Sequence, residues 1–278
     1  MMKPILFNTD MVNAILREPP WNKTVTRRVV KGDIPEDAIW EYTTFIPKGC
    51  ILCRGPIGYG KKVFKLPYQK GDILYVRETW AFMNCINCNG DYRRPENDPP
   101  CYDTQAVEYD DGDSISDGCF IYRAGCRTPE RITWRPSIHM PKAAARIFLR
   151  VTDVRVERLQ DITEAQAVKE GIIRLYDEMP DAEYLDWTRR TGIYPKAKEE
   201  WGYKNYLWHG NFGMHGMGNK MSDAWKYQYS SYDSARDSFF SLWNTTVPLK
   251  DWNVYGCDAN PWVWVIEFER CEKPESEG

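Results

Sequence analysis

The 278-residue sequence predicts an α+β fold, in which a small mixed β-barrel carries helices at its sides. Three observations predict it. Segments with strand character dominate the early part of the chain, a short helix stands between two long strands, and the last structured segment is again a strand. The order of these segments does not fix the topology of the barrel.

The chain begins with a helix and a strand. Residues 4–17 start extended and continue as a helix, because the polar residues 8–10 can cap it and its apolar residues fall on one face. Two prolines end this helix at residues 19 and 20. Residues 23–30 are rich in β-branched side chains, which favours a strand.

The next part of the chain alternates between irregular and extended segments. Residues 32–62 are rich in glycine and proline and are expected to be irregular. Residues 63–66 and 73–80 have strand character and are expected to pair as a hairpin around residues 69–72.

The second half contains the clearest periodic patterns. Residues 145–159 alternate apolar and polar side chains, as in a strand with one wet face. Residues 163–171 begin with a capping threonine and close on glycine, which predicts a short helix. Residues 232–243 form an amphipathic helix, and residues 261–270 form the last strand.

Two polar regions interrupt these elements and are interpreted as insertions in a single domain over residues 1–278. They lie at about residues 83–130 and 173–230. The first contains an acidic run at 108–113, and the second contains an aromatic segment at 201–229. One open interpretation is a phage accessory protein that uses these insertions to bind another protein.

Charge and motif content exclude several classes of protein. A formal net charge of −3 argues against strong non-specific binding of DNA by the whole molecule, although a local basic patch could still bind nucleic acid. No apolar run is long enough for a membrane span, and no signal-peptide layout is seen, so a cytoplasmic protein without a membrane partner is expected. Neither a phosphate-binding loop nor a dinucleotide fingerprint is present, so no nucleotide cofactor is expected.

Nine cysteines in a cytoplasmic chain favour a metal or free thiols over disulfides. Cys50 and Cys53, and likewise Cys85 and Cys88, share a C-I-x-C-x-G pattern that is typical of a zinc knuckle. The expected hairpin between them would bring the four thiolates to one end and complete a structural zinc site. A rival set replaces Cys50 and Cys53 with two cysteines of the first insertion. These alternatives are Cys101 and Cys119.

Four segments in order resemble the ASCH family, whose fold is PUA-like. Residues 23–28 read K-T-V-T-R-R and residues 70–76 read K-G-D-I-L-Y-V. Residues 151–171 lead from a long strand into an I-T-E-A-Q-A-V-K-E-G helix, and residues 263–268 close the set. The phrases RETW and WRPSIHMPK also resemble phage and prophage members of this family. The resemblance covers roughly 100 residues and implies a protein that handles RNA or modified nucleosides.

The resemblance also implies a chemical site. Bacterial members that remove the acetyl group of N4-acetylcytidine use a lysine, a threonine and a glutamate, which correspond here to Lys23, Thr26 and Glu170. A carboxylate can take the proton of a threonine hydroxyl while an ammonium stabilises the oxyanion, so these residue types suit hydrolysis of an amide. Arg28 would add a second fixed positive charge. If residues 23 and 26 lie on one straight strand, however, they point to opposite faces.

The RETW segment supplies further candidate ligand-binding residues, namely Arg77, Glu78 and Trp80. Arg77 and Glu78 are adjacent on the expected strand, so only one of them can face inward. Glu78 shares the face of Trp80, and a buried carboxylate there needs a partner, such as an arginine of residues 146–158.

Besides a phage accessory protein, three classes of function are open. The first is an amidohydrolase that acts on an N4-acylated cytidine. The second is a non-catalytic module that binds RNA or a modified base; its 12 tryptophans and 17 tyrosines could stack on bases or simply build the core. The third is a ribonuclease, which is less favoured because no obvious pair of histidines is present.

Overall fold

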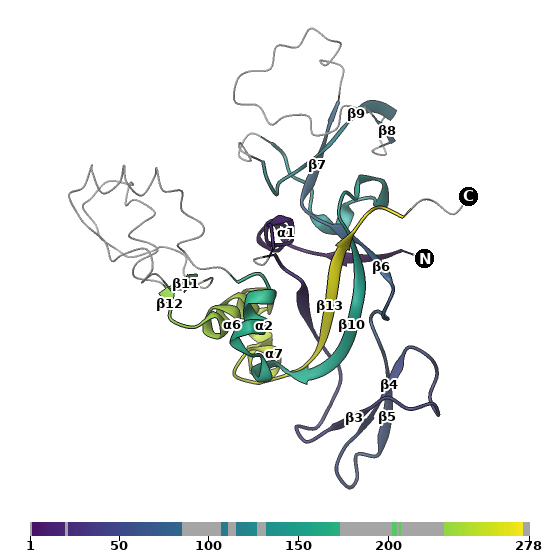
Figure 1. Cartoon of the computed structure of the whole chain (residues 1–278), viewed down its shortest axis with the longest axis vertical. Helices are drawn as coiled ribbons and strands as arrows, with labels where there is room; N and C mark the ends of the chain where they lie inside the picture. Colours follow the sequence, from purple (N-terminus) through teal and green to yellow (C-terminus); the bar gives the residue numbers. More distant parts are fainter. Residues whose placement is uncertain are drawn as a thin grey trace, which may run out of the picture. The chain divides into compact units, whose positions relative to one another are not determined.

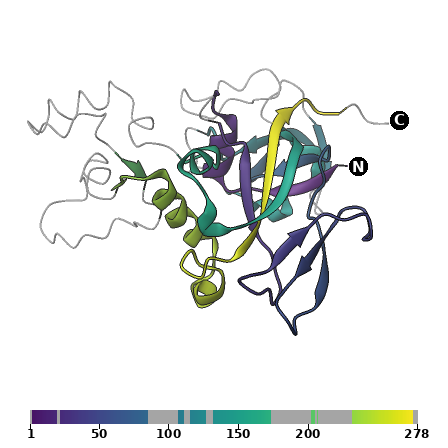
Figure 2. The same ribbon diagram turned by 60° about the horizontal axis from the view of Figure 1, so that its bottom comes forward.

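A computed structural model describes residues 2–19, 22–84, 107–110, 115–126, 132–172, 202–204, 206 and 231–274 (Figures 1 and 2). The contacts divide the chain into two compact units, each built from separate segments. Unit 1 comprises residues 1–17, 70–152 and 268–278, and unit 2 comprises residues 18–69 and 153–267. The single domain with two insertions stays a prediction, since most of the expected insertions lie outside the described residues.

Five strands form a mixed sheet. They are β1 (Lys3–Leu6), β2 (Val25–Val29), β6 (Ile73–Arg77), β10 (Phe148–Arg158) and β13 (Trp262–Cys271), and their order in the sheet is β1-β6-β10-β13-β2. Strand β1 is parallel to β6, whereas β6 pairs antiparallel with β10 and β13 pairs antiparallel with β2. The predicted α+β class is confirmed, while closure into a PUA-like barrel stays a prediction.

Smaller sheets account for the remaining strands. The first contains β3 (Ile39–Glu41), β4 (Cys50–Arg54) and β5 (Lys61–Lys65) in consecutive antiparallel order. The second contains β7 (Trp80–Asn84), β8 (Val107–Asp110) and β9 (Ile115–Tyr122) in the order β7-β9-β8. A two-stranded sheet joins β11 (Tyr203–Lys204) to β12 (Ser231–Tyr232).

The prediction that residues 63–66 and 73–80 pair as a hairpin around residues 69–72 is wrong. Strand β5 pairs with β4, whereas β6 pairs with β1 and β10. Residues 32–62, expected to be irregular, contain β3, β4 and the first residues of β5. The turn itself is present, because Gly71 has a φ of +89° and its amide donates to the carbonyl oxygen of Val151. A turn signal shows where the chain reverses, but tertiary packing decides which strands pair.

The predicted helices are confirmed. They are α1 (Thr9–Leu16), α2 (Glu164–Lys169) and α6 (Ala235–Thr246), accompanied by α7 (Trp252–Tyr255) and the short 3-10 turns η3 (Ser137–His139), η4 (Lys142–Ala144), η5 (Leu159–Asp161) and η7 (Leu249–Asp251). The Asn8 side chain caps α1 by accepting from the amide of Met11. Throughout the described part of the chain, no helix combines the length and apolar character that crossing a bilayer requires.

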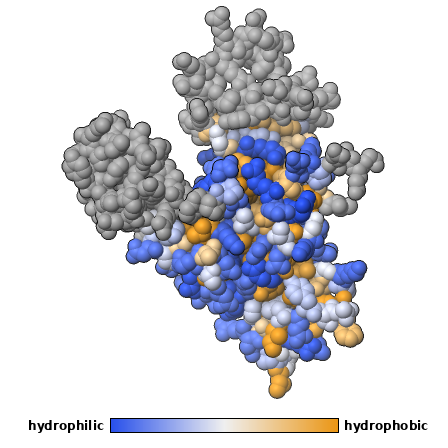
Figure 3. Space-filling model, viewed as in Figure 1, coloured by the Kyte–Doolittle hydropathy of each residue, from blue (hydrophilic) through white to orange (hydrophobic). Residues whose placement is uncertain are grey.

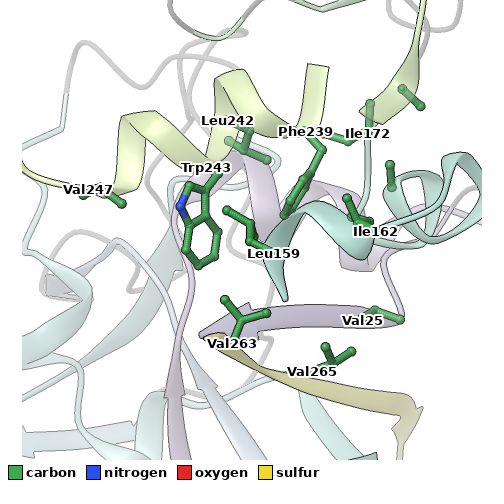
Figure 4. Close-up of a cluster of buried hydrophobic side chains, with 12 residues drawn as sticks. Val25, Leu159, Ile162, Ile172, Phe239, Leu242, Trp243, Val247, Val263 and Val265 are labelled. Carbon is green, nitrogen blue, oxygen red and sulfur yellow. The ribbon is translucent and has the colours of Figure 1, made fainter. Parts of the chain in front are cut away.

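The core of unit 2 forms where α6 and the segment around α2 pack on β2 and β13 (Figure 4). Val25, Val263 and Val265 enter this cluster from the strands, and Phe239 and Trp243 enter it from α6. The five side chains are each at most 6% exposed. This packing holds the end of α2 close to the beginning of β2, where the candidate site lies.

Candidate functional site

The structure brings Lys23 and Glu170 into direct contact, although 147 positions separate them in the chain. The ammonium nitrogen Nζ of Lys23 lies 2.6 Å from Oε2 of Glu170 and donates a second hydrogen bond to the backbone oxygen of the same residue, at 2.7 Å. The two side chains are 0% and 3% exposed. A buried charge needs a partner, and each of these groups supplies one to the other.

Local structure positions both residues at the ends of elements. A capping box between Thr163 and Gln166 fixes the start of α2. Glu170 follows the last residue of α2, and Gly171 ends the helical turn with a φ of +91°. The amide of Thr24 donates to the carbonyl oxygen of Lys169 at 2.9 Å, which ties the start of β2 to the end of α2. The backbone therefore sets the distance between the two charged groups.

Arg27 is a third member of this cluster. Its Nη1 lies 3.0 Å from Oε1 of Glu170, so each carboxylate oxygen of Glu170 accepts from a different cation. Its Nη2 lies 3.2 Å from Glu157, and its guanidinium group stands 5.8 Å from the ring centre of Phe239. Because the Arg27 side chain is 0% exposed, these contacts are made out of water.

Further ion pairs continue from Glu157 towards the solvent. Arg155 contacts Glu157 at 2.5 Å, Glu267 at 2.6 Å and Asp153 at 3.0 Å. Burial works against the charge of Arg155, but the hydrogen bonds that Arg155 donates to these three carboxylates outweigh it and raise its pKa. The network therefore runs without interruption from the buried Lys23 to half-exposed side chains on β10 and β13.

Burial changes how readily the cations of the cluster lose a proton. It lowers the pKa of Lys23 below its ordinary value of 10.5, although Glu170 acts in the opposite direction. The neighbouring charges of Arg28 and Arg27 add to the lowering. Burial also lowers the pKa of Arg28, while the charges of Glu170 and Tyr68 oppose it. The ammonium of Lys23 thus gives up its proton more easily than an exposed lysine does.

Thr26 lies on β2, three residues after Lys23, and is 1% exposed. It is registered opposite Ile266, whereas Arg27 is registered opposite Val265 of the unit 2 core. Neighbouring strand residues point to opposite faces, so the hydroxyl of Thr26 leaves β2 on the face opposite to Arg27. The strand therefore presents Thr26 and Arg27 on two different sides.

Arg77, Glu78 and Trp80 belong to unit 1, and their described contacts are with residues of that unit. Both oxygens of Glu78 accept from Arg146, at 2.9 and 3.0 Å, so the expected partner among residues 146–158 is confirmed. Arg77 donates to the backbone oxygen of Ile138. Trp80 is 0% exposed in the unit 1 core. These contacts account for the three residues as parts of the packing of unit 1.

The cysteines are arranged differently from the expected zinc knuckles. Cys50 and Cys53 lie within strand β4 and not in a turn, and residues three apart on a strand point to opposite faces. These two thiols therefore do not converge on one ion. Cys85, Cys88 and Cys101 lie outside the described residues, and Cys119 is buried in β9. Within the part of the chain that is described, no cluster of three metal-binding side chains occurs, and the zinc site stays a prediction.

Sequence reasoning missed Arg27 and the ion pairs of β10. The ion pair of Arg155 with Glu157 could have been predicted, because the two residues are two positions apart on an expected strand and therefore share a face. Arg27 could not be predicted as a site residue, because it stands between the candidates Thr26 and Arg28 and a strand neighbour points to the opposite face. Only its register opposite Val265 shows which face it occupies.

Comparisons with family models, with curated proteins and with solved structures found no match to this chain. The residues of the site and their geometry are therefore the basis of the functional argument.

Proposed function

We propose that this chain is an ASCH-type protein with a PUA-like fold that acts on modified nucleosides, by hydrolysing an amide such as that of N4-acetylated cytidine. The observation that carries the proposal is the 2.6 Å contact between Lys23 and Glu170. Two of the three residues implied by the resemblance thus meet in the fold, at positions that are distant in the sequence. The third residue, Thr26, lies on the strand that follows Lys23.

The proposed chemistry uses groups of this chain alone, and it requires Glu170 to leave Arg27, because the Thr26 hydroxyl and Arg27 stand on opposite faces of β2. Glu170 takes the proton of the Thr26 hydroxyl as its oxygen attacks the acyl carbon, and the ammonium of Lys23 stabilises the charge on the carbonyl oxygen. Collapse of this intermediate expels the amine of the base, which receives the proton from Glu170. A water molecule then cleaves the ester on Thr26, releases the carboxylic acid and restores the hydroxyl.

Burial sets a condition on this chemistry. The three residues are between 1% and 4% exposed, and both oxygens of Glu170 accept from cations. A nucleoside must therefore displace a covering segment and release one of those two contacts before Glu170 can accept a proton.

The experiment is incubation of the purified protein with N4-acetylcytidine, followed by chromatographic detection of cytidine. The wild type is expected to release cytidine. The variants Thr26→Val, Lys23→Met and Glu170→Gln are expected to lower the rate at least about a hundredfold, the scale of positioned acid-base and oxyanion groups. Thr24→Val is the matched control, because it removes a hydroxyl two residues away. Absence of cytidine with the folded wild type refutes the hydrolase.

A second candidate is a non-catalytic module that binds RNA or a modified base. The observation that favours it is the pairing of both Glu170 oxygens with fully buried cations, because such a cluster fastens α2 to β2 without any need for a reaction. A salt-titrated binding assay with RNA separates the two. Binding without release of cytidine favours the module, and unchanged affinity after Arg28→Ala excludes the site around Lys23 from the binding surface.

A further inference from the structure

One part of the chain has a charge opposite to that of the whole. The protein has a formal net charge of −3, but residues 42–69 contain five basic residues and no acidic residue. All of them belong to unit 2. They are Lys48, Arg54, Lys61, Lys62 and Lys65. This segment consists of β4, β5 and the loops beside them, and the third strand of their sheet, β3, adds one acidic residue, Glu41, so the sheet carries an excess of positive charge.

The two faces of this sheet have different surroundings. On the inner face, Trp40 pairs with Cys53, and its ring stands 5.7 Å from Trp262 and 6.1 Å from Trp264. This face is therefore packed inside unit 2. The register places Arg54, Lys61 and Lys65 on the other face, together with Ile39 and Val63.

This second face is largely open to solvent, although Leu52 on β4 is only 8% exposed. We call it the outer face; its residues are Ile39, Glu41, Cys50, Leu52, Arg54, Lys61, Val63 and Lys65. Ile39 and Val63 are 60% and 51% exposed, and Lys61 and Lys65 are also exposed. Figure 3 shows hydrophobic and hydrophilic side chains mixed over this sheet. Cations flank apolar side chains along β5, where Lys61 and Lys65 stand about 13 Å apart.

The loops at the two ends of β4 carry the most exposed apolar side chains of the sheet. Phe45, between β3 and β4, is 94% exposed, and Ile57, between β4 and β5, is fully exposed. Because the three strands are consecutive and antiparallel, these two loops lie at opposite ends of β4. Apolar contacts are thus offered at both ends of a surface on which Arg54 and Lys61 lie at one end and Lys65 lies at the other.

We propose that the outer face binds a strand of single-stranded nucleic acid. Phosphates would contact Lys61, Lys65 and Arg54, and a base would stack on Phe45, since this combination of cations and exposed rings suits a flexible polyanion with apolar faces. Arg54 is held in the free protein by Glu41 at 3.0 Å, and both side chains are more than a third exposed, so a phosphate can replace the carboxylate.

An elongated partner fits this surface better than a lipid bilayer. A membrane takes up loop tips that project in one direction, whereas Phe45 and Ile57 project from opposite ends of β4. The proposed binding does not depend on hydrolysis at Lys23, because it uses exposed residues of another sheet.

The test is fluorescence anisotropy with a labelled, unmodified single-stranded RNA of 12 nucleotides. Wild type is expected to bind with an affinity that falls as salt rises. Lys61→Glu/Lys65→Glu is expected to weaken binding at least about tenfold and to reduce the slope of log affinity against log salt by about 1.4, since each phosphate contact contributes about 0.7. Phe45→Ala is expected to weaken binding about fivefold or more.

The matched control is Lys142→Glu/Lys250→Glu, which makes the same charge change at two exposed lysines outside the sheet. Wild-type affinity in this control supports the proposal, and an equal loss in both double variants overturns it. Binding to phosphatidylserine vesicles without binding to RNA also overturns it. Hydrolysis of free N4-acetylcytidine is measured in parallel; a protein that binds RNA through this face but releases no cytidine refutes the hydrolase alone.

Discussion

The buried ion pair makes a quantitative prediction for Glu170→Gln. This change keeps the size of the side chain but removes the charge that faces Lys23 and Arg27, whose side chains are both 0% exposed. Removing one partner of a buried pair typically costs about 3–5 kcal/mol, because the other charge stays buried without compensation. The folded variant can limit the loss by releasing the proton of Lys23. From the ordinary pKa of 10.5, neutralising that group at pH 7 costs about 5 kcal/mol. We therefore expect a loss of about 3–5 kcal/mol at pH 7.

The loss should shrink as the pH rises. Burial holds the pKa of Lys23 below its ordinary value, so between the folded and unfolded values the unfolded chain binds more protons. Stability from this group therefore rises with pH across that window. In Glu170→Gln, Lys23 loses the contact that raises its pKa, so its pKa in the folded protein falls further. The pH range in which stability rises with pH therefore begins at a lower pH in the variant. The difference from wild type should narrow between pH 7 and pH 10, by at most about 1.4 kcal/mol per pH unit.

The assay is urea unfolding followed by tryptophan fluorescence, with the midpoint and slope compared at several pH values. Glu41→Gln is the control, since it breaks the exposed pair with Arg54 and should cost less than about 1 kcal/mol. A loss below about 1 kcal/mol for Glu170→Gln at pH 7, or a loss that grows with pH, would refute the buried arrangement of Lys23 and Glu170.

Three further predictions concern the cap of α2, the core of unit 2 and the buried Glu78. Thr163→Ala removes the cap of α2 and should lower the unfolding free energy by about 1 kcal/mol in urea titration, whereas Thr163→Ser should largely keep it. Trp243→Ala empties part of the unit 2 core and should cost about 3–5 kcal/mol in the same titration; a loss under 1 kcal/mol would contradict that core. Burial raises the pKa of Glu78, so the folded protein retains that proton above pH 4.5 and this group's contribution to stability falls as the pH rises through its folded pKa. Glu78→Gln should remove this component from a plot of melting temperature between pH 4 and 7, and an unchanged profile would count against it.

Local patterns alone determined most of the regular elements. The cap at Asn8, the capping box at Thr163 and the alternation along β10 are written in neighbouring residues, so the helices α1 and α2 and the strand β10 could be predicted from them. The partner of Glu78 was also predictable, because a buried carboxylate on a strand face requires a nearby cation.

Only the tertiary structure decided which strands are neighbours and which charges meet. The turn before β6 is visible in the sequence, but β5 and β6 join different sheets, because pairing depends on distant segments that compete for the same strand edge. The same holds for the cluster at Glu170. Its contact with Lys23 followed from a resemblance, yet the role of Arg27 depends on the register of β2 against β13, and a shift of one residue there would turn Arg27 to the opposite face.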